Sequence, residues 1–219
     1  MDSVWTVALA AACLILLLIL RCLWILAEIQ RHRKNGFPKS PRTQPCKTLV
    51  VLGSGGHTSE MLRMVGQLDP KKYHPIEFVV ADTDHTSVQR LEKVLPDRKH
   101  SIHKIPRSRE VGQSYASSLV STLHALFYAI GVTVRIRPEL LLCNGPGTCV
   151  PVVMGAWMLR ILGVSSKFVF IESFCRTQTL SLTGKILYPG LVDCFVVHWE
   201  SLHRKYPNSY LSSTFVKQT

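Results

Sequence analysis

The segment Gly53-Ser54-Gly55-Gly56-His57-Thr58 has the composition of an anion-binding loop. It follows the apolar run 47–53 and precedes apolar residues at helical spacing, so it joins a strand to a helix. Glycines let backbone N–H groups approach a ligand, and a helix N-terminus attracts negative charge. We therefore predict that a phosphate or diphosphate is bound by Gly53, Ser54, Gly55, Gly56 and Thr58. A tight turn that uses glycine only for its geometry is the alternative.

Two standard phosphate motifs do not fit this loop. A P-loop requires Gly-Lys-Ser/Thr, whereas the sequence here is Gly56-His57-Thr58. The dinucleotide fingerprint G-x-G-x-x-G requires glycine in place of Thr58. Asp82 and Asp84 nevertheless lie where a ribose-binding acid would be expected, so a dinucleotide-binding oxidoreductase remains an alternative. Capping of the following helix is the other role open to these two aspartates.

Further polar residues follow other predicted strands. Arg107 and Arg109 lie in the loop after the third strand, where forked guanidinium groups suit a diphosphate. Contact with lipid head groups, or plain solvation, is their alternative. Asn144, Gly145 and Gly147 form the exit of the fourth strand and are predicted to line an acceptor sugar or to face a partner. A plain turn is the alternative for this second glycine-rich segment.

Two residues are candidates for a general base. His57 is the first, because it lies at a helix N-terminus beside the glycine loop; capping that helix or binding a phosphate is its alternative role. Glu172 ends an apolar strand at the same edge, with an ion pair to Arg176 as its alternative. The His and acidic residues show no metal-ligand spacing, so we predict neither a metal site nor a cofactor.

The elements that must position these residues alternate along the chain. Strands are predicted at 47–53, 76–81, 102–105, 139–144, 167–172 and 194–198, with helices between them, including 86–95 and 115–136, and a short helix after the last strand. This pattern indicates an α/β fold, a Rossmann-like parallel sheet covered by helices on both faces. Ligands of such sheets bind at the carboxyl ends of the strands, where the polar residues above are concentrated.

The N-terminal segment has the length and composition of a membrane anchor. Residues 4–20 carry no charge, and the apolar character resumes after Arg21 as far as residue 27. A signal peptide would carry its positive charges before the apolar run, whereas here they follow it. We predict a lumenal N-terminus at 1–3, a transmembrane helix at 4–27, a basic, proline-containing linker at 28–46 and a cytosolic domain at 47–219.

Composition narrows the class of partner. The chain has 26 Lys and Arg against 14 Asp and Glu, a net charge of +12, which indicates an anionic neighbour such as a membrane surface or phosphates. The basic residues are scattered and lack any nucleic-acid-binding signature, so we predict no nucleic acid partner. Seven cysteines without a CxxC pair are typical of a reducing compartment.

Several segments in order resemble one family of glycosyltransferase subunits. Gly-Ser-Gly-Gly-His-Thr is similar to the acceptor-side loop of GT-B transferases that glycosylate lipid diphosphates. Further similar segments are 81–84, 105–111, 143–148, 172–173 and 180–187. Together with the single N-terminal span, they resemble the anchoring, acceptor-binding subunit of the dolichol-pathway UDP-N-acetylglucosamine transferase over nearly the whole chain.

The resemblance implies a division of labour between two chains. This chain would bind the acceptor N-acetylglucosaminyl-diphospho-dolichol, and a small cytosolic catalytic subunit would bind UDP-N-acetylglucosamine. The complex would add the second, β-1,4-linked sugar in lipid-linked oligosaccharide synthesis for N-glycosylation, and this chain would be inactive alone. The implied location is the endoplasmic reticulum membrane or nuclear envelope, and the preceding N-acetylglucosamine-phosphate transferase of the pathway is a further candidate partner.

One segment departs from the family pattern. The resemblance implies a short apolar docking tail after Lys205-Tyr206-Pro207, but residues 210–219 form a longer, more polar segment. Tyr210, Leu211, Phe215 and Val216 are its candidates for partner docking, through either an adapted contact or a weaker one. A membrane scaffold with a vestigial site is the further alternative for the whole chain.

Overall fold

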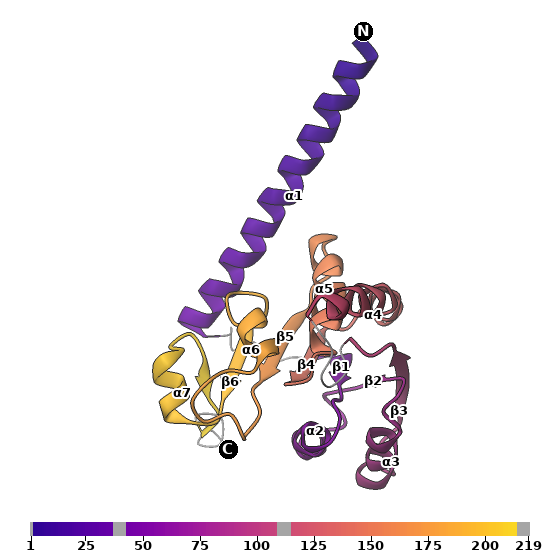
Figure 1. The fold of residues 1–219 in the computed structure, drawn as a ribbon, viewed down its shortest axis with the longest axis vertical. Helices are drawn as coiled ribbons and strands as arrows, with labels where there is room; N and C mark the ends of the chain where they lie inside the picture. Colours follow the sequence, from indigo (N-terminus) through magenta and orange to yellow (C-terminus); the bar gives the residue numbers. More distant parts are fainter. Residues whose placement is uncertain (1, 37–42, 109–114, 214–219) are drawn as a thin grey trace.

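The computed structural model describes residues 2–36, 43–108 and 115–213, whose strands form one parallel sheet in the order β3-β2-β1-β4-β5-β6-β7 (Figure 1). The strands are β1 (Thr48–Val51), β2 (Ile76–Ala81), β3 (His100–Ile105), β4 (Leu140–Asn144), β5 (Lys167–Ile171), β6 (Cys194–Val197) and β7 (Tyr210–Leu211). The helices are α1 (Asp2–Asn35), α2 (Gly56–Gly66), α3 (His85–Val94), α4 (Tyr115–Ile136), α5 (Cys149–Ile161), α6 (Leu182–Leu187) and α7 (Glu200–Lys205). The predicted Rossmann-like fold is confirmed.

Alternating side chains of the strands build a core on each face of the sheet. In β1, Leu49 and Val51 join a cluster with residues of α1, α4 and α5, whereas Val50 joins a cluster with residues of α2 and α3. All three are fully buried. This alternation follows from the two-residue period of a strand, and each such side chain contributes about 1.5–3 kcal/mol when removed from water.

The order of the strands creates a crevice in the middle of the sheet. The chain runs outward from β1 to β2 and β3, and then returns to place β4 on the other side of β1. The connections that leave β1 and β4 therefore diverge to opposite faces. Such a switch point is where open α/β sheets bind their ligands.

Helix α1 is a single element of 34 residues that belongs partly to the core. Its N-terminal portion projects away from the sheet (Figure 1). The apolar side chains of this portion are exposed, among them Val4 and Trp5. Ile25 and Ile29, four residues apart on one helix face, are fully buried in the larger core cluster. Residues 28–35, which we expected in a linker, are therefore helical and packed on the body, because their apolar and charged side chains have partners there.

Polar contacts fasten the C-terminal part of α1 to the sheet. The buried Arg33 guanidinium donates to the Val192 carbonyl through Nη2 at 2.6 Å and to the Tyr188 carbonyl through Nη1 at 2.6 Å. Lys167 Nζ donates to the Glu28 carboxylate at 2.9 Å. The helix thus continues into the body without a flexible joint between residues 25 and 33.

The strand β7 was not predicted from the sequence. Tyr210 and Leu211, expected in a docking tail, pair with β6 at the edge of the sheet. The Tyr210 hydroxyl donates to the carbonyl of His32 in α1 at 3.1 Å. Two residues are too short a run for a periodic signal, and their pairing depends on β6 and α1. Phe215 and Val216 lie outside the described residues.

Replacing Arg33 by methionine should destabilise the body. The change keeps much of the side-chain volume but leaves the carbonyls of Tyr188 and Val192 without their donor, at a cost of about 1–3 kcal/mol per buried group. Chemical denaturation of the full chain in detergent measures this loss in the free energy of unfolding. Arg31→Met is the matched control, because Arg31 is exposed on the same helix. Equal stability of the two variants would contradict the packed junction.

Candidate functional site

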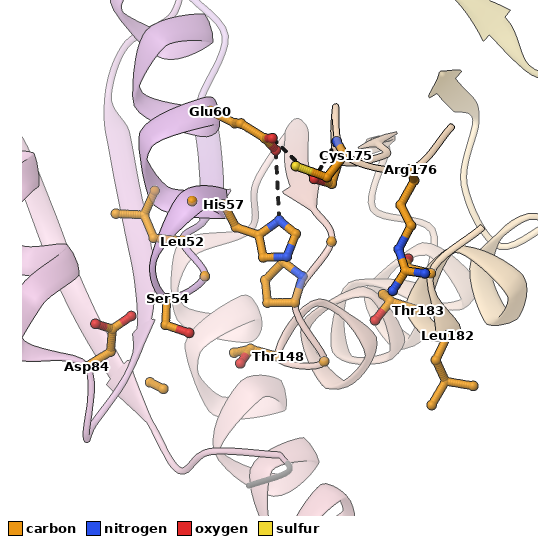
Figure 2. Close-up of a pocket in the computed structure, with 18 of the residues that line it drawn as sticks. Leu52, Ser54, His57, Glu60, Asp84, Thr148, Cys175, Arg176, Leu182 and Thr183 are labelled. Carbon is orange, nitrogen blue, oxygen red and sulfur yellow. Dashed lines mark hydrogen bonds and ion pairs between the residues drawn. The ribbon is translucent and has the colours of Figure 1, made fainter. Parts of the chain in front are cut away.

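A cleft of about 840 Å³ opens at the carboxyl edge of the sheet (Figure 2). It is lined by the loops that follow β1, β4 and β5, by the start of α6, and by Arg107 after β3. In Figure 2, His57 lies between Ser54 and Asp84 on one side and Arg176 and Thr183 on the other. The predicted residues that line the cleft are Gly53, Ser54, Gly56, His57, Asp84, Arg107, Gly145 and Gly147.

The glycine loop presents the start of α2 to this cleft. Gly55 has a φ of +66°, a conformation that glycine adopts without strain, and α2 begins at the next residue. Because Gly55 is the N-cap and has no side chain, it leaves the first N–H groups of α2 for a ligand. Arg90 Nη1 donates to the Gly55 carbonyl at 2.8 Å, and this hydrogen bond ties the loop to α3. This arrangement suits an anion.

Thr58 supports the loop from inside the fold. Its side chain is fully buried, and its hydroxyl donates to the Gly53 carbonyl. Ser87 Oγ of α3 also lies 3.0 Å from that carbonyl. We predicted Thr58 as a ligand contact, but the structure turns its side chain away from the cleft, because α3 covers that side of the loop.

The loops after β1 and β4 pack so closely that glycine is required in both. A Cβ on Gly53 would lie 2.6 Å from Cγ of Pro146. A Cβ on Gly145, whose φ is +66°, would collide with the imidazole of His57. The second glycine segment is therefore more than a plain turn, because it sets the position of the His57 ring.

Asn144 and Glu60 orient this imidazole. His57 Nδ1 lies 2.9 Å from Asn144 Oδ1, and Asn144 Nδ2 donates to Glu60 Oε2 at 3.1 Å. An ionised carboxylate only accepts hydrogen bonds, so Glu60 must face the amide nitrogen of Asn144. The amide oxygen then faces His57 and accepts from Nδ1–H. In the neutral ring this leaves Nε2 with its lone pair, as a base requires.

Glu60 is a residue that our sequence analysis missed. In addition to its contact with Asn144, the Glu60 carboxylate lies 3.9 Å from His57 Nδ1 and accepts a hydrogen bond from Ser173 Oγ at 3.2 Å. A dashed line in Figure 2 joins Glu60 and His57. Its position three residues after His57 on the same helix was a usable signal, since such residues share a face. Ser173 and Arg176 also line the cleft, and only the folded sheet brings them to His57.

The two aspartates after β2 have different positions. Asp84 caps α3, since its Oδ1 accepts from the Ser87 amide at 3.1 Å and its Oδ2 from the Ser87 hydroxyl at 2.6 Å. Burial opposes ionisation of this carboxyl, but the bonds from Ser87 and Thr86 and the charge of Arg107 outweigh burial and lower its pKa. Asp82 is exposed and lies outside the cleft lining. The helix-capping alternative thus holds for Asp84.

Glu172 lies beneath the cleft and is fully buried. Its Oε2 accepts from the amide and the hydroxyl of Ser181 at 2.9 and 3.0 Å, and its Oε1 accepts from the Ser173 amide at 3.0 Å. Its carboxylate is thus occupied by Ser173 and Ser181, and among the described residues it forms no ion pair with Arg176, the partner we considered. The carboxylate fastens the β5 loop to the start of α6. Arg109 lies outside the described residues.

This architecture defines one half of a GT-B fold. The chain aligns with MurG of Acinetobacter baumannii with a TM-score of 0.52 at 16% identity, over 70% of this chain and 41% of that one. A structure described as that of a putative UDP-N-acetylglucosamine 2-epimerase from Listeria monocytogenes aligns equally well, over 74% of this chain and 42% of that one. This chain therefore spans less than half the length of these two structures.

The chain belongs to the family described as "Oligosaccharide biosynthesis protein Alg14 like", whose profile matches residues 48–215. It is 42% identical to the UDP-N-acetylglucosamine transferase subunit ALG14 of Homo sapiens, over 95% of this chain and 97% of that protein. The subunit of the same name in Yarrowia lipolytica is 35% identical, over 94% and 96%. The family resemblance found in the sequence is confirmed.

Replacing Glu172 by glutamine should weaken the fold. The shape is kept, but an amide NH₂ would face an N–H donor, and the unmet buried groups cost about 1–3 kcal/mol. Urea denaturation measures the change, with Glu92→Gln on the exposed surface of α3 as the control. An unchanged midpoint for Glu172→Gln would contradict this structural role.

Proposed function

We propose that this chain is the membrane-anchoring, acceptor-binding subunit of a UDP-N-acetylglucosamine transferase. The complex would add a second N-acetylglucosamine, in β-1,4 linkage, to N-acetylglucosaminyl-diphospho-dolichol on the cytosolic face of the endoplasmic reticulum. The observation that carries this proposal is that an oriented imidazole, an uncapped helix N-terminus and two arginines meet in one cleft. The names of the relatives support the sugar donor.

The acceptor diphosphate would bind at the start of α2. The free N–H groups of the glycine loop and the helix dipole favour negative charge there. Arg107 and Arg176 enter the same cleft from the loops after β3 and β5. Two forked cations and a helix N-terminus match the charge of a diphosphate better than that of a neutral ligand.

His57 would act as the general base. Its Nε2 takes the proton of the acceptor hydroxyl while that oxygen forms a bond to the anomeric carbon of the donor sugar, and the bond to UDP breaks. One displacement of this kind inverts the anomeric centre. Asn144 keeps the proton of the neutral His57 ring on Nδ1, and the Glu60 carboxylate stabilises the imidazolium that forms when Nε2 takes up the second proton. We place the base at His57 and not at Glu172, because Glu172 is buried and already hydrogen-bonded.

A second chain would supply the donor-binding half. This chain contains one Rossmann-like lobe and aligns with 41% of MurG. The relatives are named as subunits, which supports the existence of a partner chain. In this proposal the partner is soluble and faces the cleft. The chain alone would then be inactive, because one lobe of a GT-B fold supplies only one half of the site. The oxidoreductase alternative is weaker, since Asp84 is engaged as a helix cap.

Two faces of the molecule support a position at the membrane surface. Helices α1 and α4 are both long and apolar enough to cross a membrane. α4 packs on α5 as part of the domain, yet Leu119, Leu123 and Phe127 are 57–77% exposed. In Figure 1, α1 leaves the body on the side where α4 and α5 lie. The apolar surface of α4 would then rest in the membrane to which α1 anchors the chain.

His57→Ala should reduce turnover of the reconstituted complex by about 10²–10⁴-fold, the usual contribution of a general base. A transferase assay with UDP-N-acetylglucosamine and a lipid-diphosphate-linked N-acetylglucosamine measures it. His85→Ala, at an exposed position on α3, is the control. Full activity of His57→Ala in a correctly folded complex would exclude this base.

Phe127→Glu should reduce transfer to a long-chain acceptor in bilayers at least about tenfold, because a charge on α4 opposes contact with the membrane. Transfer to a water-soluble, short-chain acceptor should stay unchanged, since the cleft is intact. Lys93→Glu, an exposed change on α3, is the control. Equal losses with both acceptors would show that the variant damages the site instead.

A further inference from the structure

A second cavity lies between α1 and the segment that joins α5 to β5. It has a volume of about 170 Å³ and is separate from the acceptor cleft. Arg21, Trp24 and Glu28 line it from α1, and Arg160 together with residues 163–167 line it from the body. Its walls therefore come from the anchor helix and from the sheet domain together.

Arg21 brings an unbalanced positive charge to this cavity. Its guanidinium donates to the carbonyls of Arg160 and Ile161 at the end of α5, at 3.1 and 3.3 Å, and lies 4.6 Å from the ring centroid of Trp24. Among the described residues no carboxylate pairs with it. Carbonyl oxygens and an aromatic ring orient a guanidinium without neutralising it.

The other charged side chains around the cavity form ion pairs with one another. Arg160 donates to both carboxylate oxygens of the buried Asp193, at 2.8 and 3.0 Å. Lys167 Nζ lies 2.9 Å from Glu28 and 3.4 Å from Asp193. Three cations thus surround the cavity against two carboxylates, and the excess charge is that of Arg21.

Ser166 adds an unused hydrogen-bond donor. The residue lines the cavity and is 4% exposed, and its hydroxyl has no hydrogen-bond partner among the described residues. An unmet buried hydroxyl is costly, so such groups in folded proteins usually have a partner. The oxygen is shielded in the unbound structure, so a rotation of the Ser166 side chain would bring its hydroxyl to a ligand oxygen in the cavity.

The place of the cavity along α1 indicates where the ligand comes from. The uncharged segment of α1 runs from Val4 to Leu20 and ends at Arg21. Arg and Trp at the end of an apolar span lie at the level of lipid head groups. Met158 and Leu162, at the nearby end of α5, are exposed apolar side chains at the same junction. A membrane that contains α1 would bring lipid phosphates to this cavity.

We propose that this cavity binds the phosphate of an anionic phospholipid, with Arg21 and Ser166 as its contacts. The site rests on the membrane anchoring proposed above and is independent of the acceptor chemistry. Because the cavity has one wall on α1 and one on the body, a bound phosphate bridges them and stabilises their junction. The cationic surroundings disfavour zwitterionic head groups such as phosphatidylcholine.

The test uses the full chain in nanodiscs of phosphatidylcholine, with phosphatidylglycerol added in steps. Thermal stability and lipid retention in native mass spectrometry are the readouts. We expect phosphatidylglycerol to raise the melting temperature and one molecule of it to be retained. Arg21→Gln should weaken retention by about 10–100-fold, as expected for a charge-assisted hydrogen bond. Arg31→Gln removes the same charge from an exposed position of α1 and should leave retention nearly unchanged.

Ser166→Ala keeps the test valid even if Arg21→Gln disturbs folding. Without phosphatidylglycerol this variant should melt at the same or a higher temperature, because it removes an unmet hydroxyl. With phosphatidylglycerol it should lose about fivefold in retention, so its two readouts move in opposite directions. The proposal would be overturned if Arg21→Gln and Arg31→Gln lost phosphatidylglycerol retention equally and Ser166→Ala left it unchanged. Retention would then depend only on the overall positive charge of the surface.

Inorganic phosphate separates the two sources of the ligand. If millimolar phosphate stabilises the chain in pure phosphatidylcholine and displaces phosphatidylglycerol, the cavity is a phosphate site that free anions also reach. If it does neither, the acyl chains are part of recognition and the site is specific for lipid. Transferase activity of the reconstituted complex, measured in parallel, tests the proposed function separately, because neither Arg21 nor Ser166 lines the acceptor cleft.

Discussion

The close approach of the loops after β1 and β4 is the contact on which the functional edge of this protein depends. Gly145 leaves room for the His57 ring, and Gly53 leaves room for Pro146. With a side chain at either glycine, the two loops would separate, and His57 would lose the Asn144 oxygen that orients it. The site thus depends on the absence of a side chain at Gly53 and Gly145 as much as on its polar residues.

A second set of contacts turns the apolar N-terminal helix into part of the domain. Ile25 and Ile29 fill the larger core, while Arg33 supplies donors to carbonyls of the loop before β6. The ion pairs of Glu28, Arg160 and Asp193 lie at this junction, where unpaired charges would be costly. As a result the orientation of the body relative to α1 is set by packing, and the apolar surface of α4 and the cavity at Arg21 have defined positions relative to any membrane that holds α1.

Much of the fold and part of the candidate site could be predicted from the sequence. Apolar runs of strand length and helical spacing located six strands and the helices between them, because both signals are local. The glycine loop, His57, Arg107 and Gly145 were recognised by residue type at strand ends and do meet in one cleft. The misses have a common cause: Glu60 and Arg176 carry ordinary polar side chains whose importance arises only from their neighbours in space.

The sequence by itself therefore determined the strand–helix alternation, the edge of the sheet that holds the polar loops, and the family. Only the tertiary structure decided which way side chains point. It turned Thr58 inward under α3, engaged Glu172 with Ser181, extended α1 through the expected linker, and paired Tyr210 and Leu211 as an edge strand. The physical reason is that periodicity and turn chemistry are properties of adjacent residues, whereas burial and hydrogen-bond partners depend on residues far apart in the chain.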